Sequence, residues 1–345
     1  MNPESSNHVA TFANHLFVVL LAAACACTAA LVLASFPAGI YTAIFTVLTP
    51  GIGPATQFSI FVWLGPLPVT IPFGVAVGVI VVVTTTIYGL LIALAAARGT
   101  RAFRAFSDAY KDGFSHLLRS DFVVALVSMG FLVFTVTAID AFTSAIGVKT
   151  GAPSGNDVEV FLGSLIAPLT EEFGFRLCII GIFALLLTIG TSRRQISSAL
   201  WRPSSIYEGD ETRTGKVLIL VFALGISSLA FGVAHLSPGS GWQIGKLPEA
   251  VYGGVVLGYL YIRYGFHIAV LAHWGLDFVG SVFAYFGQGV YGISANSFPG
   301  FILQELTYFD LIAGIGSLSF ILVTYLGLKR VRTMTAKRVS PPRSS

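Results

Sequence analysis

The sequence is poor in charge: only 10% of its 345 residues are Asp, Glu, Lys or Arg, whereas 55% are hydrophobic. Soluble globular proteins carry roughly a quarter of charged residues, so an ordinary soluble domain is excluded and a membrane protein is predicted. Lys and Arg are absent from residues 1–15. Because a secretory signal peptide begins with a basic segment, we expect the first apolar run to be a retained helix.

Cysteine is also scarce, with Cys25, Cys27 and Cys178 as the complete set and no CxxC spacing. A disulfide framework and a thiolate zinc site are therefore not indicated. The sequence has neither a G-x-S-x-G nor an H-E-x-x-H motif, which removes the usual signatures of serine hydrolases and zincins. It shows no internal repeat, which disfavours an inverted-repeat transporter.

Long apolar runs are what the sequence has in abundance. Each is long enough for a helix that crosses the hydrocarbon core, which takes about 20 residues, and they are continuous, unlike the short alternating strands of a β-barrel. We predict an all-α, polytopic transmembrane helical bundle of about eight spans. They are placed at residues 16–36, 69–97, 122–146, 159–190, 217–236, 248–263, 266–286 and 309–328.

The apolar stretch 37–68 contains several prolines and glycines. We expect it to be a re-entrant segment, an interfacial segment or a loop.

The basic residues are distributed unevenly between the predicted loops. Loops 98–121 and 191–216 each hold five, the tail after residue 328 holds six, and Arg263 lies at a turn on the same side; Lys149 and Lys246 lie on the other. Positively charged loops stay in the cytoplasm, so both termini are predicted to be cytoplasmic. The same pattern explains the net charge of +4 without a nucleic acid partner.

Segment 98–121 mixes aromatic with basic residues, which suits an amphipathic helix on anionic lipid headgroups, or a solvated loop helix. The predicted organisation has N-terminal transmembrane helices in 1–150, a core in 155–285, a last transmembrane helix in 286–328 and a disordered basic tail in 329–345.

The fourth predicted span carries an EExxxR pattern, from Glu171 to Arg176. Ionisable groups at bilayer depth cost about 2.5–3.5 kcal/mol on insertion scales, so they are usually paired and functional. Glu172 and Arg176 are four residues apart and share a helix face, which predicts an ion pair that supports the site. Glu171 points about 100° away, so we expect it to face a cavity as an available base.

Two further spans carry histidine. Phe231 and His235 share a face at the end of the fifth span, and His273 and Asp277 share a face in the seventh. Taken singly, His235 is weak evidence, and the second pair is either a packing clasp or part of a site. Together, a carboxylate and imidazoles from three spans can meet in one cavity and provide a base and oxyanion donors for peptide hydrolysis.

With these motifs the sequence resembles the CAAX prenyl protease and bacteriocin-processing family, which comprises type II CAAX endopeptidases and their prokaryotic relatives. The resemblance rests on EExxxR at Glu171–Arg176, FxxxH at Phe231–His235 and HxxxD at His273–Asp277, in that order. It covers about residues 155–285 and does not extend to 1–150. It implies an intramembrane protease, in the cell membrane of a prokaryote.

Carried over residue by residue, the resemblance implies that Glu171 and His235 activate a water molecule while His273 and Asp277 stabilise the oxyanion. Glu172, Arg176 and Phe231 would be supporting residues. Many family members have Asn where this chain has Asp277. Ionised Asp cannot donate a hydrogen bond, so Asp277 must be protonated, orient His273 or contact a metal.

Glu171, His235 and His273 are also a plausible zinc set. The family is commonly labelled a metalloprotease family, yet it also supports a glutamate-dependent mechanism, so the cofactor is open. The predicted partners are membrane lipids and a peptide or lipidated protein substrate. The alternative functions are a proton- or ion-coupled transporter and a non-catalytic scaffold or immunity protein.

Overall fold

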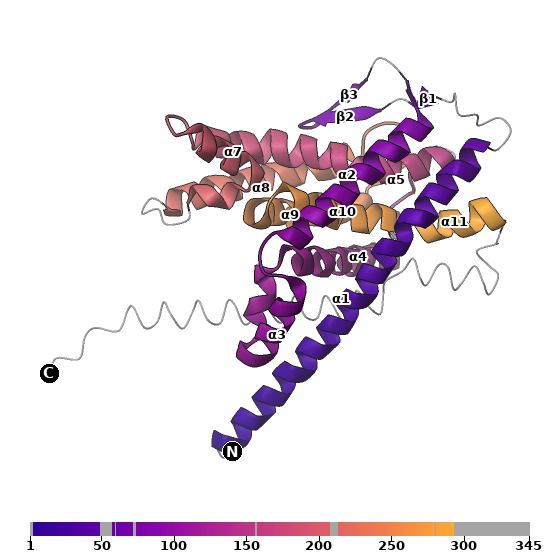
Figure 1. The fold of residues 1–345 in the computed structure, drawn as a ribbon. Helices are drawn as coiled ribbons and strands as arrows, with labels where there is room; N and C mark the ends of the chain where they lie inside the picture. Colours follow the sequence, from indigo (N-terminus) through magenta and orange to yellow (C-terminus); the bar gives the residue numbers. More distant parts are fainter. Residues whose placement is uncertain are drawn as a thin grey trace.

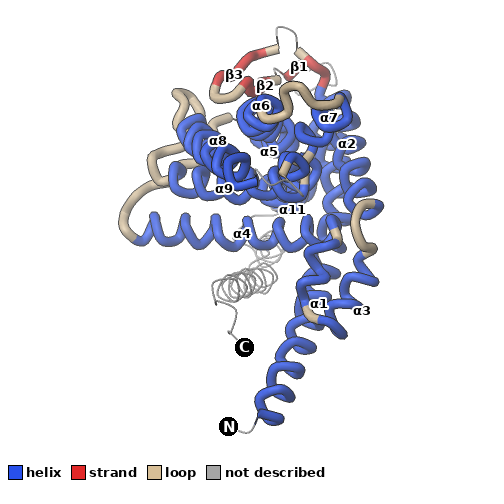
Figure 2. Tube along the Cα trace, turned by 90° about the vertical axis from the view of Figure 1, so that its left-hand side faces the viewer, coloured by secondary structure: helices blue, strands red, loops and turns tan. Residues whose placement is uncertain are grey.

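The computed structural model describes residues 3–48, 57–58, 60–71, 74–155, 157–207, 213–279 and 281–292, and most of them are helical. Figures 1 and 2 show the helices gathered into one bundle, with the short strands at one end. The helices are α1 (Pro3–Leu48), α2 (Val77–Ala97), α3 (Ala102–Asp112), α4 (Asp121–Ala145), α5 (Asp157–Glu171), α6 (Gly181–Leu186), α7 (Arg193–Trp201), α8 (Arg213–Ala234), α9 (Lys246–Tyr264), α10 (Phe266–Trp274) and α11 (Val282–Tyr291).

Four shorter helical segments join or extend these helices. Two are 3₁₀ turns and two are π-helices, in which the hydrogen bonds reach one residue further than in an α-helix. The 3₁₀ turns are η1 (Phe114–Arg119) and η3 (Pro203–Ile206), and the π-helices are η2 (Glu172–Ile180) and η4 (Gly275–Val279).

Five helices of the described part are long and apolar enough to cross a membrane: residues 11–45, 77–97, 121–145, 214–234 and 266–287. Their apolar side chains are widely exposed on the outside of the bundle, as in Val82 and Leu90 of α2. A soluble protein buries such surface, whereas a lipid-facing helix need not. The chain is therefore a polytopic helical membrane protein.

The remaining predicted spans differ from these five. Residues 159–190 are helical only as three short elements, because the geometry changes at Glu172 and Gly181. Helix α9, in place of the span 248–263, contains three charged residues in its 19 positions. The predicted span 309–328 and the tail 329–345 lie outside the described residues.

The expectation of an all-α fold was wrong in one segment. Strands β1 (Gln57–Phe58) and β4 (Val75–Ala76) pair with each other, and β2 (Phe61–Leu64) pairs with β3 (Leu67–Thr70), both antiparallel. The second helix therefore begins at Val77 rather than at residue 69. The apolar run 69–97 concealed this boundary, because a short buried or lipid-facing strand is as apolar as a helix.

Helix α1 continues through Pro37 to Leu48, where the sequence predicted the end of a span. Proline removes one backbone hydrogen bond, but neighbouring side chains and helices in a membrane bundle compensate for it. Ser35, buried, donates a hydrogen bond to the carbonyl of Val32 in this turn. Figure 1 shows α1 running obliquely beside α2.

Glycines let α8 and α9 approach closely. A Cβ on Gly254 would lie 2.9 Å from the Ser228 Cα, and one on Gly258 would lie 2.3 Å from the Leu224 Cδ1. Small residues at helix contacts allow the backbones of membrane helices to pack against each other. This pair also packs against η2 and α10, which carry the motif residues of the fourth and seventh predicted spans.

The loops form two groups at opposite ends of α4. At its start, His267 of α10 lies 3.1 Å from Asp121 and stacks on Trp201 of α7. After its end, Gly151 pairs with Trp242 of the α8–α9 loop.

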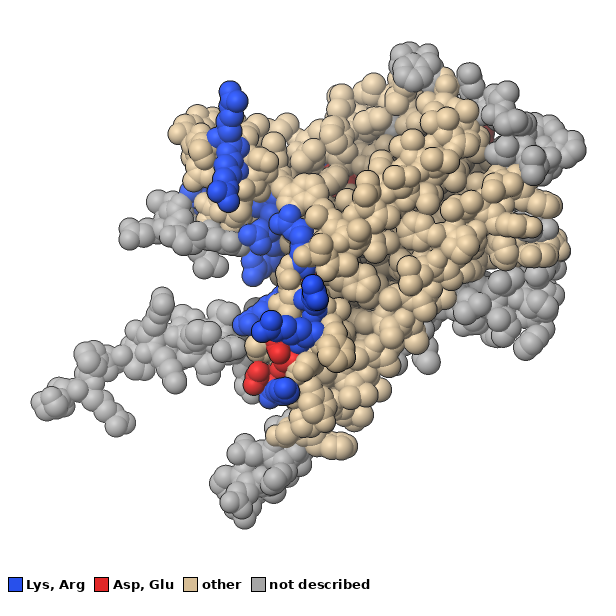
Figure 3. All heavy atoms as spheres, viewed as in Figure 1, with Lys and Arg blue, Asp and Glu red and all other residues tan. Residues whose placement is uncertain are grey.

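Figure 3 shows Lys and Arg side chains gathered in one band over α3 and α7. The exposed basic residues of these helices and of the loops beside α3 are Arg98, Arg101, Arg104, Lys111, Arg119, Arg193 and Arg194. They belong to the end where α4 begins, so the two most basic loops share one side of the bundle, as the charge pattern predicted.

Candidate functional site

Glu172 is the most deeply placed carboxylate of the site. Its side chain and that of Arg176 have no exposed surface, and Arg176 Nε lies 3.1 Å from Glu172 Oε2. The arginine also lies over the Phe231 ring, 4.4 Å from its centroid. The predicted ion pair is therefore present, and the buried guanidinium lies against one carboxylate and one aromatic face.

The second oxygen of Glu172 binds a different helix. His273 Nδ1, on α10, lies 2.9 Å from Glu172 Oε1. The sequence predicted only the contact of Glu172 with Arg176, because spacing along one helix does not show which neighbouring helix faces it. Glu172 thus links the guanidinium to the histidine.

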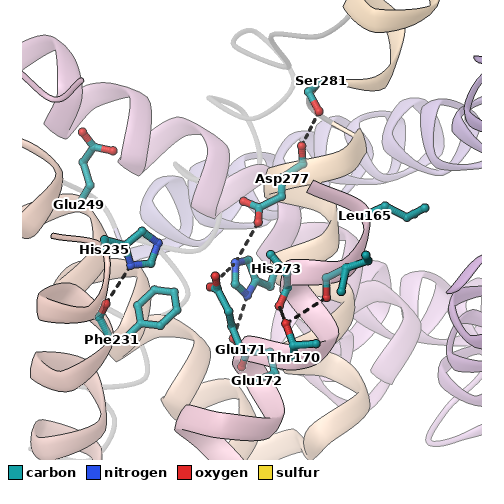
Figure 4. A network of polar contacts seen from close by, with 12 residues as sticks. Leu165, Thr170, Glu171, Glu172, Phe231, His235, Glu249, His273, Asp277 and Ser281 are labelled. Carbon is teal, nitrogen blue, oxygen red and sulfur yellow. Dashed lines mark hydrogen bonds and ion pairs between the residues drawn. The ribbon is translucent and has the colours of Figure 1, made fainter. Parts of the chain in front are cut away.

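His273 is surrounded by acids on both ring nitrogens (Figure 4). Its Nε2 lies 3.2 Å from Asp277 Oδ2, one turn further along the helix, and 3.8 Å from Glu171 Oε2. Carboxylate oxygens only accept hydrogen bonds when ionised. To donate to both Glu172 and Asp277, His273 would carry a hydrogen on each ring nitrogen.

Glu171 is the carboxylate with the fewest direct partners. Its side chain is 15% exposed, against 0% for Glu172, and the 3.8 Å separation from His273 is longer than a hydrogen bond. Glu172 and Asp277 each lie within hydrogen-bond distance of His273 and Glu171 does not, while Asp277, at 28%, is more exposed than Glu171.

His235 stands apart from the other three. Its Nδ1 lies 2.8 Å from the carbonyl oxygen of Phe231, and because a carbonyl only accepts, this nitrogen carries the hydrogen. Among the described residues, no hydrogen bond or ion pair joins His235 to Glu171 or His273. The Phe231 ring connects them instead, with centroids 4.7 Å from the His235 ring and 5.8 Å from the His273 ring.

Two of the motifs lie in π-helices, a feature that the sequence did not predict. Glu172 to Arg176 occupy the start of η2, and Asp277 lies within η4. π-Helical turns are rare and often occur at functional sites, because they shift side chains relative to a regular helix. Ser227 of α8, fully buried, donates a hydrogen bond of 2.7 Å to the Phe175 carbonyl and so ties η2 to α8.

The arrangement does not fit the zinc set of Glu171, His235 and His273. Both nitrogens of His273 already face carboxylates, and His235 contacts the group through an aromatic ring. In the part of the chain that the structure describes, no three His, Cys, Asp or Glu side chains are grouped to hold a metal ion.

The fold and the site together define a polytopic membrane protein with a buried cluster of carboxylates and histidine inside its helical bundle. Residues 154–279 match the model of the Rce1-like family, the type II CAAX prenyl endopeptidases. The resemblance stated from the motifs is confirmed over these residues, and the family that they match is a family of proteases. No curated protein and no solved structure matches the chain.

Proposed function

We propose that the protein is an intramembrane endopeptidase that hydrolyses a peptide bond with a water molecule activated by Glu171 and His235. The observation that carries the proposal is that His273 contacts Glu172 and Asp277 and lies close to Glu171. All four residues lie inside the segment that matches a protease family. Buried ionisable groups are costly in a membrane protein and are usually retained for function.

Glu171 is the general base of this proposal. Its carboxylate lies beyond hydrogen-bond distance of His273, so it can accept a proton from water while the water oxygen attacks the peptide carbonyl carbon. His235 assists, because its Nδ1 hydrogen is donated to Phe231 and its Nε2 lone pair is left to bind the same water. The proton then passes to the leaving amine when the C–N bond breaks.

We propose that the Nε2 hydrogen of His273, which faces Asp277, is shared with the negative oxygen of the tetrahedral intermediate. An imidazolium in a water-poor site is a strong electrostatic partner for such an oxygen, and removal of one comparable donor typically costs about 10²–10³-fold in kcat. Of the three roles that the sequence left open for Asp277, we propose that it orients His273. Glu172 holds the other face of the same ring.

We further propose the predicted eight-span topology with both termini in the cytoplasm of a prokaryote. Helix α3 would lie on anionic headgroups, because Phe103 is 88% exposed beside basic residues while Ala105 and Ala109 pack inward. The substrate would be a peptide or a lipidated protein that reaches the site from the membrane.

The test is cleavage by the purified protein in lipid of a panel of prenylated and unmodified peptides. We expect wild type to cleave at least one of them and Glu171→Gln and His235→Ala to lose cleavage by at least about 100-fold. Two matched control variants lie in and beside α3. Asp108→Asn changes a carboxylate that pairs with Arg104, and His15→Ala removes a histidine whose ring stacks on Tyr110.

Three results would contradict the proposal. The first is no cleavage by wild type; the second is equal cleavage by the Glu171 and His235 variants. The third is a proton flux across vesicles that both variants abolish, which would indicate a transporter. Assays with and without a chelator test the metal-dependent alternative, and we expect the chelator to have no effect on cleavage.

A further inference from the structure

The hairpin formed by β2 and β3 lies outside the segment that matches the protease family, at the end of the bundle seen at the top of Figure 1. Four residue pairs hold it, from Phe61↔Thr70 to Leu64↔Leu67. Its two-residue turn begins with Gly65 at φ +62°, the position where the type II′ hairpin turn requires glycine. An isolated two-stranded hairpin is marginally stable, so this one depends on what it packs against.

The hairpin packs against η2, in the middle of the EExxxR motif. A Cβ on Gly174 would lie 2.3 Å from the Trp63 Cβ and 2.6 Å from the Trp63 carbonyl oxygen. Real Cβ atoms do not approach so closely, so the strand lies directly on the backbone of the motif helix, and the residue two positions after Glu172 must be glycine. Further along, Gly65 lies against the side chain of Ile179.

A chain of aromatic rings leads from the hairpin to the site. The Trp63 ring lies 5.4 Å from that of Phe175, which meets Phe231 edge-on at 5.1 Å. Phe231 in turn contacts His235 and carries Arg176 over its face. The buried members of this group, together with Ala234 and Ala250, form a small hydrophobic cluster separate from the main core, and Trp63 covers it from the hairpin side.

We propose that the hairpin is a strap that positions the site and that Trp63 is its positioning residue. Trp63 touches no reacting group. It acts through Phe175 and Phe231, which set where Arg176 and His235 stand relative to Glu171. This inference rests on the proposed function: removal of the indole ring frees the two phenylalanines, and a displacement of about 1 Å between reacting groups can lower a rate about 100-fold.

The first experiment measures kcat and KM of the full-length protein in lipid on a peptide that wild type cleaves. We expect Trp63→Ala to lower kcat about 10- to 100-fold with KM changed less than about threefold, and Trp63→Phe to recover most of the rate. Leu67→Ala is the matched control, because Leu67 is on the same hairpin and 66% exposed, and should behave as wild type.

A second variant changes Gly174, the residue of η2 that Trp63 contacts. Gly174→Ala should push the strand away from η2 and reproduce the kcat loss of Trp63→Ala. The double variant should be no slower than the slower single variant, because both changes break one contact. Additive losses would overturn the inference, because they would mean that the two residues act separately.

Hydrogen exchange supplies a readout that does not need activity. In Trp63→Ala, amide exchange of residues 172–180 should rise while that of α4 stays at the wild-type rate. Unchanged exchange in η2 overturns the inference whether or not the protein cleaves peptides, as does an unchanged kcat in an active wild-type background. Absence of cleavage by wild type overturns the proposed function alone.

Discussion

Glu171 and Glu172 are neighbours in the chain, yet the bundle gives them different surroundings. Glu172 is fully buried between Arg176 and His273, whereas Glu171 is 15% exposed and lies 3.8 Å from His273, beyond hydrogen-bond distance. Such a difference between adjacent carboxylates is what separates a supporting residue from a general base. Substitutions at the two positions should therefore have different consequences.

We expect Glu172→Gln to lower the apparent free energy of unfolding by about 3 kcal/mol, because it leaves the buried Arg176 without its anionic partner. Glu171→Gln should change stability by less than about 1 kcal/mol and abolish cleavage. Unfolding in a denaturing detergent, followed by circular dichroism, measures the first quantity. Equal destabilisation by both variants would contradict the separation of roles.

Asp277 can be tested against the Asn that many family members have. An Asn oxygen still accepts a hydrogen bond from His273 Nε2, so Asp277→Asn should retain cleavage within about tenfold of wild type. Asp277→Ala removes the contact of 3.2 Å and should lower kcat about 100-fold. Loss of activity in the Asn variant as large as in the Ala variant would show that the charge, and not the orientation, is needed.

At the scale of the element, α8 and α9 pack closely at two glycines of α9, where atoms of α8 occupy the space that a Cβ would take. Gly254 faces the Ser228 backbone at a distance that leaves no room for a Cβ, whereas Gly258 faces the movable end of the Leu224 side chain. Gly253, in the same helix, has nothing within 4 Å of the position of its Cβ. The sequence alone does not distinguish these glycines, because all three lie in one apolar stretch.

We expect Gly254→Ala to destabilise the protein by about 1–3 kcal/mol, since it forces the added methyl against the Ser228 backbone. Gly253→Ala should be neutral or stabilise the helix by up to about 1 kcal/mol, because alanine is the better helix former. The apparent melting temperatures of the two purified variants give the comparison. A lower melting temperature for Gly253→Ala than for Gly254→Ala would contradict the packing described for α8 and α9.

At the scale of the whole molecule, the two loop groups at opposite ends of α4 make the topology testable. The test starts from a variant without the three native cysteines. Three further variants each place one cysteine at an exposed residue: Ser115, Ser197 or Gln243. We expect the first two to react with an impermeant maleimide only after the membrane is opened, and Gln243→Cys to react in intact cells. Reaction of Ser115→Cys and Ser197→Cys from outside would reverse the orientation.

The sequence predicted the membrane class, the approximate positions of five spans and the ion pair of Glu172 with Arg176, because hydropathy and helical spacing are local properties. It did not predict the hairpin at 61–70, since that apolar segment suits a strand as well as a helix. It also missed the π-helices, whose extra residue per turn has no local signature in the motif.

Composition and motif spacing by themselves determined that this protein is a polytopic helical membrane protein with a protease-like set of ionisable residues. Only the tertiary structure decided which of them meet: His273 contacts Glu172 and Asp277 directly, while His235 meets the group through Phe231. The physical reason is that spacing along one helix sets which residues share a face, whereas helix packing sets what that face touches.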